Sequence, residues 1–340
     1  MTTRRALLAT PMLLLCALAG CAGPQNPLDP AGPQAQHVDG LWWLYFWICA
    51  FVFFAVSAFT LIALARRRDA DDTIEIVPTA GRERRAGMVA SAAVVLTVLL
   101  LVVLIAGDLV VGRSLQDMET ARDSLPVKII GHQWWWEVEY RDGGPDQMVR
   151  TANEIKIPVG RPIRFELSSN DVIHSFWIPN LHGKKDLIPG RPTSITMRAD
   201  REGSFTGQCA EYCGHQHAHM RFTVAAVSPE AFDDWLAHQR QPAPEPRSES
   251  ELRGREVFLT GTCVMCHTIM GTPAGSRMGP DLTHVASRPS IAGGTLPNTR
   301  GNLAGWILDP QHIKPGVRMP NQTLPAADLH ALLDYLESLK

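Results

Sequence analysis

Cysteine, histidine and methionine gather in one short stretch, GQCAEYCGHQHAHM, at residues 207–220. Cys209 and Cys213 open it, and His217 and Met220 follow at close spacing. An exported cysteine pair often forms a disulfide, and zinc would accept two cysteines and a histidine. Thiolate, imidazole and thioether together favour copper, because a thioether is a poor ligand for zinc. A single copper would need only one cysteine, so the second thiolate indicates two copper ions bridged by both.

Two bridged coppers would each need an imidazole, so this pattern predicts a second histidine from another segment. NDVIHSFWIP supplies His174 at the end of a predicted strand upstream of the cysteines. A histidine in such a place is more often an ordinary surface or core residue. The neighbouring cysteine loop makes His174 a candidate ligand.

A second cluster, CVMCH, has the C-x-x-C-H spacing at which haem is attached in c-type cytochromes. Cys263 and Cys266 would add to the haem vinyl groups, and His267 would bind the iron as proximal ligand. The alternative is a redox-active C-x-x-C pair. The adjacent histidine and the exported location favour haem.

The N-terminus has the composition of an export signal. MTTRRALLATPMLLLCALAGC begins with arginines, continues with an apolar run too short to span a bilayer, and ends in LAGC. We expect a signal peptide at residues 1–20. LAGC resembles a bacterial lipobox, in which Cys21 would be lipidated, and the alternative is an ordinary signal with an incidental cysteine.

Two long apolar stretches, at residues 41–65 and 86–111, exceed the roughly 20 residues that cross a hydrocarbon core. Neither has a polar face, so buried core helices fit poorly and two transmembrane helices are predicted. Residues 66–85 between them carry six arginines, which places this loop in the cytoplasm by the positive-inside rule. Residues 21–40 and the C-terminal part would then lie on the periplasmic side of a bacterial inner membrane.

The exported part divides by composition. Residues 121–240 contain short β-rich segments, such as VKIIGHQWWWEVEY, separated by turn residues, which predicts an all-β sandwich of Greek-key type. Residues 241–250, QPAPEPRSES, predict a linker. Residues 251–340 turn helical, with leucines on one face of the last segment, and predict a small all-α domain.

HSFWIP, KDLIPGR and C-x-E-x-C-G-x-x-H-x-x-M resemble cytochrome c oxidase subunit II, and the resemblance covers roughly residues 35–240. It implies a multidomain membrane protein with a two-helix transmembrane hairpin and an all-β cupredoxin-like sandwich. The sandwich of this family carries the dinuclear copper centre CuA. The small all-α domain would be a fused cytochrome c, as in a caa-type oxidase.

The resemblance also implies a ligand set. Cys209 and Cys213 would bridge the coppers, while His174 and His217 would each bind one. Met220 would be a weak ligand.

Three further residues have roles that only the resemblance implies. Glu211 would give its backbone carbonyl to copper and its carboxylate to a magnesium ion shared with the large subunit. Trp134 in GHQWWW matches the position of electron entry, and packing at an interface is the alternative. The family's glutamate and W-T-x-x-P pattern at the second membrane helix are missing here. The carboxylate is absent or replaced by Glu83 slightly upstream, so the resemblance does not imply a role in proton uptake.

The distal haem ligand must come from a methionine or histidine of the last domain. Met265 and Met270 are too close to His267, and Met278 precedes GPDLT, which resembles the cytochrome c loop that braces the proximal histidine. WILDPQHIKPGVRMP resembles the distal segment of cytochromes fused to subunit II, which makes Met319 the predicted ligand. The alternatives are two histidines, His284 and His312.

Both predicted sites carry electrons, and the sequence offers no Ser/His/Asp or paired-carboxylate arrangement for hydrolysis. A net charge of −2 gives no support for nucleic-acid binding. We expect an oxidoreductase subunit that passes electrons from cytochrome c, or a similar donor, through haem c and CuA. Oxygen would be reduced in catalytic subunit I of a haem–copper oxidase.

Two other functions stay open at this point. One is a membrane-tethered electron carrier of another terminal reductase, such as a nitric oxide reductase. The other is a non-redox copper-binding or assembly module, which the haem attachment sequence disfavours.

Overall fold

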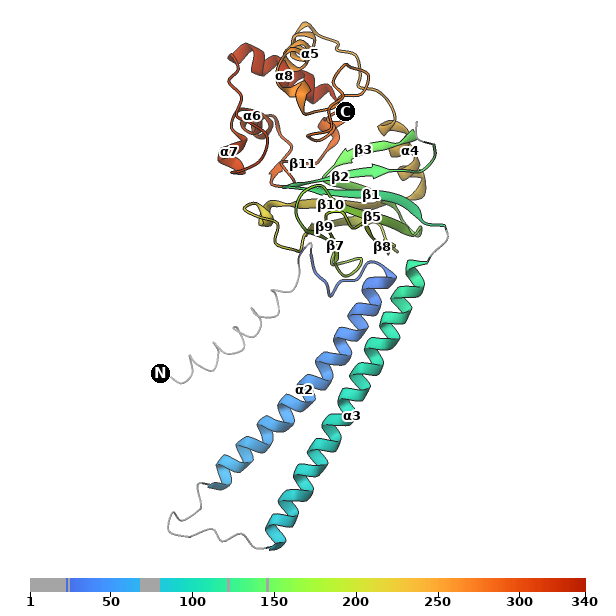
Figure 1. Ribbon diagram of the computed structural model, residues 1–340, viewed down its shortest axis with the longest axis vertical. Helices are drawn as coiled ribbons and strands as arrows, with labels where there is room; N and C mark the ends of the chain where they lie inside the picture. The colour runs from blue at the N-terminus through green and yellow to red at the C-terminus, as the bar shows by residue number, and fades with distance from the viewer. Residues whose placement is uncertain (1–22, 24, 68–79, 121–122, 145–146) are drawn as a thin grey trace, which may run out of the picture. The chain divides into compact units, whose positions relative to one another are not determined.

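The computed structural model describes residues 23, 25–67, 80–120, 123–144 and 147–340 (Figure 1). The predicted signal peptide and Cys21 lie outside these residues. The chain forms two units, of which one spans residues 36–118 and the other holds the remaining described residues.

The first unit is a pair of long helices, α2 (Pro33–Arg67) and α3 (Ala80–Glu119). Both are long and apolar enough to cross a membrane by length and composition. They extend beyond the predicted apolar spans because the helical backbone continues through polar residues at each end. Polar pairs join the two helices: the Tyr45 hydroxyl donates to Asp108 Oδ2 at 2.9 Å.

The second unit contains a β-sandwich of two five-stranded sheets. Their orders are β3-β2-β1-β5-β8 and β4-β10-β9-β6-β7. The first sheet consists of β1 (Leu125–His132), β2 (Trp135–Tyr140), β3 (Val149–Ala152), β5 (Ile163–Ser169) and β8 (Thr193–Met197). The second consists of β4 (Glu154–Pro158), β6 (His174–Trp177), β7 (Lys185–Leu187), β9 (Gly203–Cys209) and β10 (Arg221–Val227).

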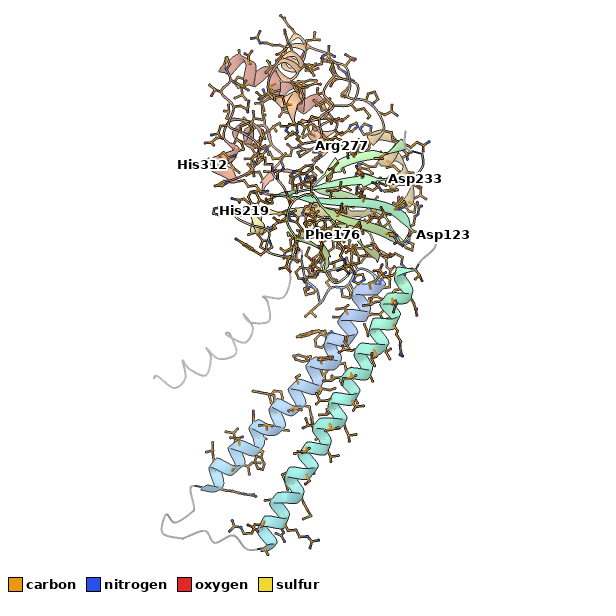
Figure 2. All side chains as sticks on the ribbon, viewed as in Figure 1. Asp123, Phe176, His219, Asp233, Arg277 and His312 are labelled. Atoms are coloured by element: carbon orange, nitrogen blue, oxygen red, sulfur yellow. The ribbon has the colours of Figure 1, made fainter. Side chains whose placement is uncertain are left out.

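Aromatic side chains fill the space between the sheets. Phe176 on β6, labelled in Figure 2, lies in the sandwich. Its ring stacks on that of Phe222 of β10 with ring centroids 4.7 Å apart, and Trp136 meets both rings edge-on. A Cβ at Gly207 would lie 2.1 Å from the Phe222 ring, so only glycine fits there. Residues of both sheets share one buried cluster, which makes the sandwich a single core.

The tryptophan run marks a turn that the sequence pattern did not predict. VKIIGHQWWWEVEY is an antiparallel hairpin, with β1 and β2 meeting where His132 pairs with Trp135. Because paired residues lie side by side, the His132 and Trp135 rings stack at 4.3 Å. Trp136 points the other way into the core, and Trp134 occupies the turn itself.

The remaining elements follow the sandwich. Helix α4 (Pro229–Gln239) begins at Ser228, whose Oγ accepts from the Ala231 amide at 3.2 Å. The C-terminal domain has the α-helices α5 (Glu249–Thr260), α6 (Arg300–Leu308), α7 (Pro310–Ile313) and α8 (Ala326–Ser338). The same domain has two 3-10 turns, Cys263–Met265 and Val285–Ser287, and two short strands, β11 (Ser290–Ile291) and β12 (Leu296–Pro297). A further 3-10 turn, His217–His219, lies in the sandwich between β9 and β10. Transmembrane-type helices, a β-sandwich and an all-α domain confirm the predicted fold class.

The segment predicted as a linker does not run free of the helical domain. The Ala243 amide donates to the Met270 carbonyl at 2.9 Å, and the Gln241 carbonyl lies 3.2 Å from His284 Nε2. These contacts fix the path of residues 241–243 along the helical domain.

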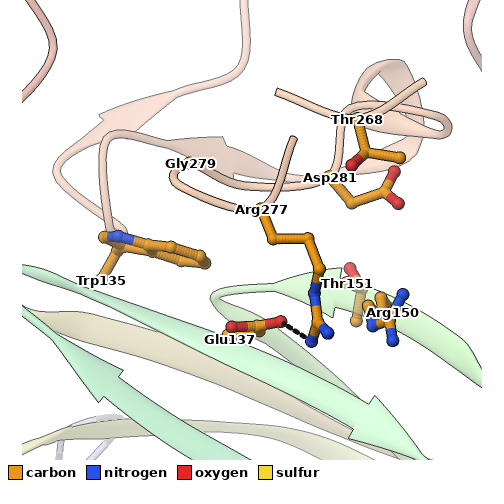
Figure 3. A pocket seen from close by; sticks show the side chains of 8 residues that line it. All are labelled: Trp135, Glu137, Arg150, Thr151, Thr268, Arg277, Gly279 and Asp281. Atoms are coloured by element: carbon orange, nitrogen blue, oxygen red, sulfur yellow. Dashed lines mark hydrogen bonds and ion pairs between the residues drawn. The ribbon is translucent and has the colours of Figure 1, made fainter. Parts of the chain in front are cut away.

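The helical domain meets β2 of the sandwich through a charged contact (Figure 3). Arg277 Nη2 donates to Glu137 at 3.0 Å and to Glu139 at 2.5 Å. Burial alone would raise the pKa of both carboxyl groups. Hydrogen bonds from His132 and Arg277 outweigh burial and lower the pKa of Glu137, and bonds from arginines lower that of Glu139.

We predict that Arg277→Gln lowers the free energy of unfolding by about 1 kcal/mol at pH 7, a modest value because the guanidinium is half exposed. Because the pKa values of Glu137 and Glu139 are lowered in the folded state, the two carboxylates stabilise the fold at pH values above their unfolded-state pKa. This stabilisation is lost as the pH falls through their folded-state pKa. The difference between the two proteins should therefore shrink below about pH 4.5. Denaturant titration of the detergent-solubilised chain at pH 7 and pH 4 measures it.

The exposed Arg164→Gln variant is the matched control and should differ little from the wild type. A difference for Arg277→Gln that stays constant across this pH range would contradict the prediction.

Candidate metal and haem sites

The cysteine loop connects β9 to β10. Cys209 ends β9, and its amide donates to the Met220 carbonyl at 3.0 Å, which closes the loop at its base. The two sulfur atoms Cys209 Sγ and Cys213 Sγ lie 3.7 Å apart as free thiols, well beyond disulfide bonding distance. Cys213 Sγ is 3.6 Å from His217 Nδ1 and 3.8 Å from Met220 Sδ.

His174 reaches the same place from β6. Phe176 of β6 pairs with Cys209 of β9, so the start of β6 lies beside the end of β9. The His174 Nδ1 atom is 3.8 Å from Cys209 Sγ. A Cβ at Gly131 would lie 2.7 Å from the His174 ring, so the glycine that begins GHQWWW is needed for this close approach. Strand pairing thus joins the ligand candidates His174, Cys209, Cys213, His217 and Met220 in one cluster, in which all but the half-buried His217 are buried.

Asp171 orients the His174 ring. Its Oδ1 is 2.8 Å from His174 Nε2, and its other carboxylate oxygen accepts from the Gln133 amide at 2.7 Å. A proton on Nε2 leaves the Nδ1 lone pair free to face the sulfur atoms, as a metal ligand requires. Sequence reasoning missed Asp171, although its position three residues before His174 in NDVIH was the available signal.

The charge of the cluster suits a cation. The hydrogen bond from the Cys213 thiol lowers the pKa of Cys209 to about 4, and the same contact raises that of Cys213. Without a cation the pair therefore holds one thiolate and one thiol. Burial would lower the pKa of His174, but its bonds to Asp171 and Cys209 raise it. Soft sulfur donors with imidazoles fit copper, and the residues present fit the dinuclear centre.

The backbone carbonyl and the side-chain carboxylate of Glu211 lie in different environments. Its backbone carbonyl lies 3.1 Å from Cys209 Sγ, in keeping with a place in the copper cluster. Its half-exposed carboxylate points to Lys184, 3.4 Å from the ammonium. Within the described part of the chain, the one group of three or more histidine, cysteine or acidic residues able to hold a metal is His174, Cys209 and Cys213. The carboxylate has no further ligand beside it here to support magnesium.

Trp134 touches the copper cluster through the backbone. Its indole Nε1 donates to the Cys213 carbonyl at 3.0 Å, and Gln133 Nε2 donates to the same oxygen at 2.8 Å. Trp134 is 8% exposed, so this side chain is closed off from solvent.

The haem attachment sequence lies on a 3-10 turn, Cys263–Met265, followed by His267. His267 Nδ1 is 2.8 Å from the Pro280 carbonyl, which leaves Nε2 as the free ligand atom. A Cβ at Gly279 would lie 2.9 Å from the His267 ring, so the GPDLT segment approaches the ring closely. Burial lowers the pKa of His267, which keeps the imidazole neutral. Two free cysteines beside a fixed neutral imidazole fit a covalent haem.

The candidates for the distal ligand differ in their surroundings. Met265, Met270 and Met278 are exposed, whereas Met319 is partly buried against the core of the helical domain. Both ring nitrogens of His284 lie near backbone carbonyls, at 2.9 and 3.2 Å. His312 is exposed. These environments favour Met319.

We predict that Asp171→Asn weakens copper binding about 10- to 100-fold, because the outer hydrogen bond that orients His174 loses its charge. Copper titration of the purified chain, followed by its visible absorption, measures the affinity. Asp142→Asn removes an exposed carboxylate of the same sandwich and should leave the affinity unchanged. Equal affinities for the two variants would contradict a role of Asp171 in orienting His174.

Comparisons with known proteins match both the sandwich and the helical domain. The family profile described as "Cytochrome C oxidase subunit II, periplasmic domain" matches residues 143–227, and the cytochrome c profile matches residues 252–340. Cytochrome c oxidase subunit 2 of Alkalihalophilus pseudofirmus is 37% identical over 330 residues, 95% of this chain and 94% of the relative. That of Bacillus subtilis is 32% identical over 231 residues, 65% of this chain and 64% of the relative.

A solved structure is also similar. The periplasmic domain of subunit II of cytochrome oxidase from Bradyrhizobium japonicum is 30% identical, with a TM-score of 0.34, and covers 35% of this chain and 96% of its own. The nearly full-length match to a relative at 37% identity decides the family. The chain belongs to the cytochrome c oxidase subunit II family, carries a cytochrome c domain, and is thus a subunit of an oxidoreductase.

Proposed function

We propose that this chain is the electron-entry subunit of a haem–copper oxidase and carries both a dinuclear CuA centre and a covalent haem c. The observation that carries the proposal is the buried cluster of two thiols, two imidazoles and a thioether, with each neighbouring pair of donors 3.6 to 3.8 Å apart. A haem attachment sequence in the same chain supports a second redox centre.

The copper-ligand candidates would have different roles. Cys209 and Cys213 would bridge, His174 and His217 would each bind one metal, and Met220 with the Glu211 carbonyl would complete the set. A bound dinuclear centre of this kind accepts and releases one electron. The protein holds the donors in a dry, closed loop, which limits how far they move between the two redox states.

In the helical domain, Cys263 and Cys266 would hold the haem covalently, and His267 and Met319 would be its axial ligands. A bound haem supplies a one-electron carrier, and a methionine with a histidine raises its potential. Trp134 would be the residue through which electrons reach the copper cluster, since its indole is bonded to the backbone of Cys213.

The partners follow from this function. The catalytic subunit of the oxidase would accept electrons from CuA and reduce oxygen to water, and cytochrome c or a similar carrier would supply them. The two apolar helices would anchor the chain, with the metal domains on the periplasmic side, as the arginines of residues 66–85 favour. Lipidation of Cys21 remains part of the proposal.

Purification of the intact complex tests this function. We expect two copper ions and one covalent haem per chain, a mixed-valence EPR signal shared by both coppers, and oxygen consumption with reduced cytochrome c. A single zinc, or a Cys209–Cys213 disulfide in copper-replete protein, would overturn the copper assignment. Nitric oxide reduction without oxygen consumption would instead favour another terminal reductase.

We predict that Met319→Ala abolishes the near-infrared sulfur-to-iron absorption band and lowers the haem potential, with the haem still attached through Cys263 and Cys266. Near-infrared spectroscopy and redox titration of the purified complex measure both. Met278→Ala changes a methionine that is 68% exposed and should leave band and potential unchanged. A Met319→Ala protein that keeps the band would refute this ligand.

A further inference from the structure

The helical domain covers Trp134 with one short segment, residues 314–317. Lys314 Nζ donates to the Trp134 carbonyl at 2.7 Å, and a Cβ at Gly316 would lie 3.5 Å from the indole ring. Val317 packs against the core cluster of the sandwich. The segment that leads to Met319 therefore lies directly on the residue bonded to Cys213.

The copper loop itself takes part in this contact. Gln216 Nε2, next to His217, donates to the Pro315 carbonyl at 2.8 Å. The Arg221 amide, next to Met220, donates to the Gly293 carbonyl at 3.0 Å. Two residues adjacent to copper-ligand candidates are thus fixed to the helical domain, and both bonds involve backbone atoms of that domain.

Lys314 is at the centre of the contact. Its side chain is 1% exposed, and Nζ donates both to the Trp134 carbonyl and, at 2.9 Å, to the Ala292 carbonyl of the β11–β12 turn. One nitrogen therefore joins the two domains. Gly293 makes room for it, because a Cβ there would lie 2.7 Å from Nζ and its φ is +67°. Burial lowers the pKa of Lys314 to about 7.

The hydrogen bonds of the buried Lys314 amine go to two neutral carbonyls, and the Cys213 sulfur is near enough to interact with its charge. Burial of such a group is an unfavourable way to stabilise an interface. An apolar side chain of similar volume in place of Lys314 would bury as much surface without desolvating a charge. What the amine adds is direction: its N–H groups fix two carbonyl oxygens at hydrogen-bonding distance, whereas an apolar chain would allow them to slide. The contact is thus suited to hold Trp134 in register rather than to add stability.

We propose that Lys314 is a positioning residue for electron transfer between the two centres, holding the Met319 segment of the cytochrome domain in register on Trp134. The inference rests on the proposed function, in which haem and CuA belong to one chain. The haem iron, when bound, would give up one electron and the copper pair would take up the same electron, with no bond broken or formed and no proton moved.

The test compares Lys314→Met with the wild type in the intact, fully loaded complex. A photoexcited ruthenium reductant injects one electron into the haem, and the loss of CuA absorption gives the rate of internal transfer. We expect Lys314→Met to slow that transfer about tenfold or more, because a small displacement of a positioned group has large kinetic cost. The rate should also become dependent on solvent viscosity, while both spectra and electron entry from external cytochrome c stay unchanged.

A second measurement does not depend on turnover. The Arg221 amide bonds to the helical domain, so its hydrogen exchange reports whether the two domains stay in register. Exchange at Arg221 should be faster in Lys314→Met than in the wild type. Lys340→Met makes the same chemical change at an exposed position of the same domain and should alter neither readout.

The outcomes separate the two proposals. No internal electron transfer in the wild-type complex would overturn the proposed function. Transfer in the wild type with an unchanged rate and unchanged Arg221 exchange in Lys314→Met would overturn the role of Lys314 alone. If Lys314→Met does not assemble, Lys314→Gln, which keeps an amide NH2 group on a shorter side chain, should show an intermediate rate and intermediate Arg221 exchange, and wild-type values for both would overturn the role of Lys314.

Discussion

A single backbone hydrogen bond, from the Cys209 amide to the Met220 carbonyl, closes the loop on which the chemistry of this chain depends. It continues the ladder in which Gln208 pairs with Arg221, so the loop starts and ends on paired strands. Sulfur and imidazole donors spread over the loop must therefore converge. Convergence places two sulfur atoms 3.7 Å apart in a buried site, where two thiolates would repel each other unless a cation lay between them. Strand pairing thus brings the two thiols into an arrangement that a bound metal cation would stabilise.

The hairpin turn of β1 and β2 connects this loop to the rest of the sandwich. Asp171 accepts from the Gln133 amide and from His174, while the side chains of Gln133 and Trp134 both donate to the Cys213 carbonyl. One turn therefore contacts both sides of the donor cluster. A displacement of Trp134 would be felt at Cys213 directly, and a displacement of Gln133 would reach His174 through Asp171. Orientation of the ligands and position of the tryptophan are parts of one network.

The sequence predicts motifs that are contiguous in the chain and misses contacts between residues that are far apart in it. Spacing alone pointed to the loop at residues 207–220 and to the C-x-x-C-H segment as candidate sites, because each is contiguous in the chain. The hairpin inside VKIIGHQWWWEVEY escaped prediction, since the segment is rich in aromatic and β-branched residues and no Gly-Pro or Asn-Gly pair marks the turn. Lys314 could not be predicted as buried, because its partner Trp134 is 180 residues away and lysine is rarely enclosed.

The contact between the sandwich and the helical domain contains residues whose burial or backbone conformation is unusual for their type. Glu137, Glu139 and Lys314 are buried although charged residues favour solvent, and Gly293 has a positive φ that few other residues adopt. Domains that met only through a flexible tether would have no reason to bury such groups, since water would solvate them better in the separated state. Each buried charge here instead finds a directional partner across the contact, either a guanidinium or a backbone carbonyl. Directional partners fix distance, and distance is what an electron-transfer contact must control.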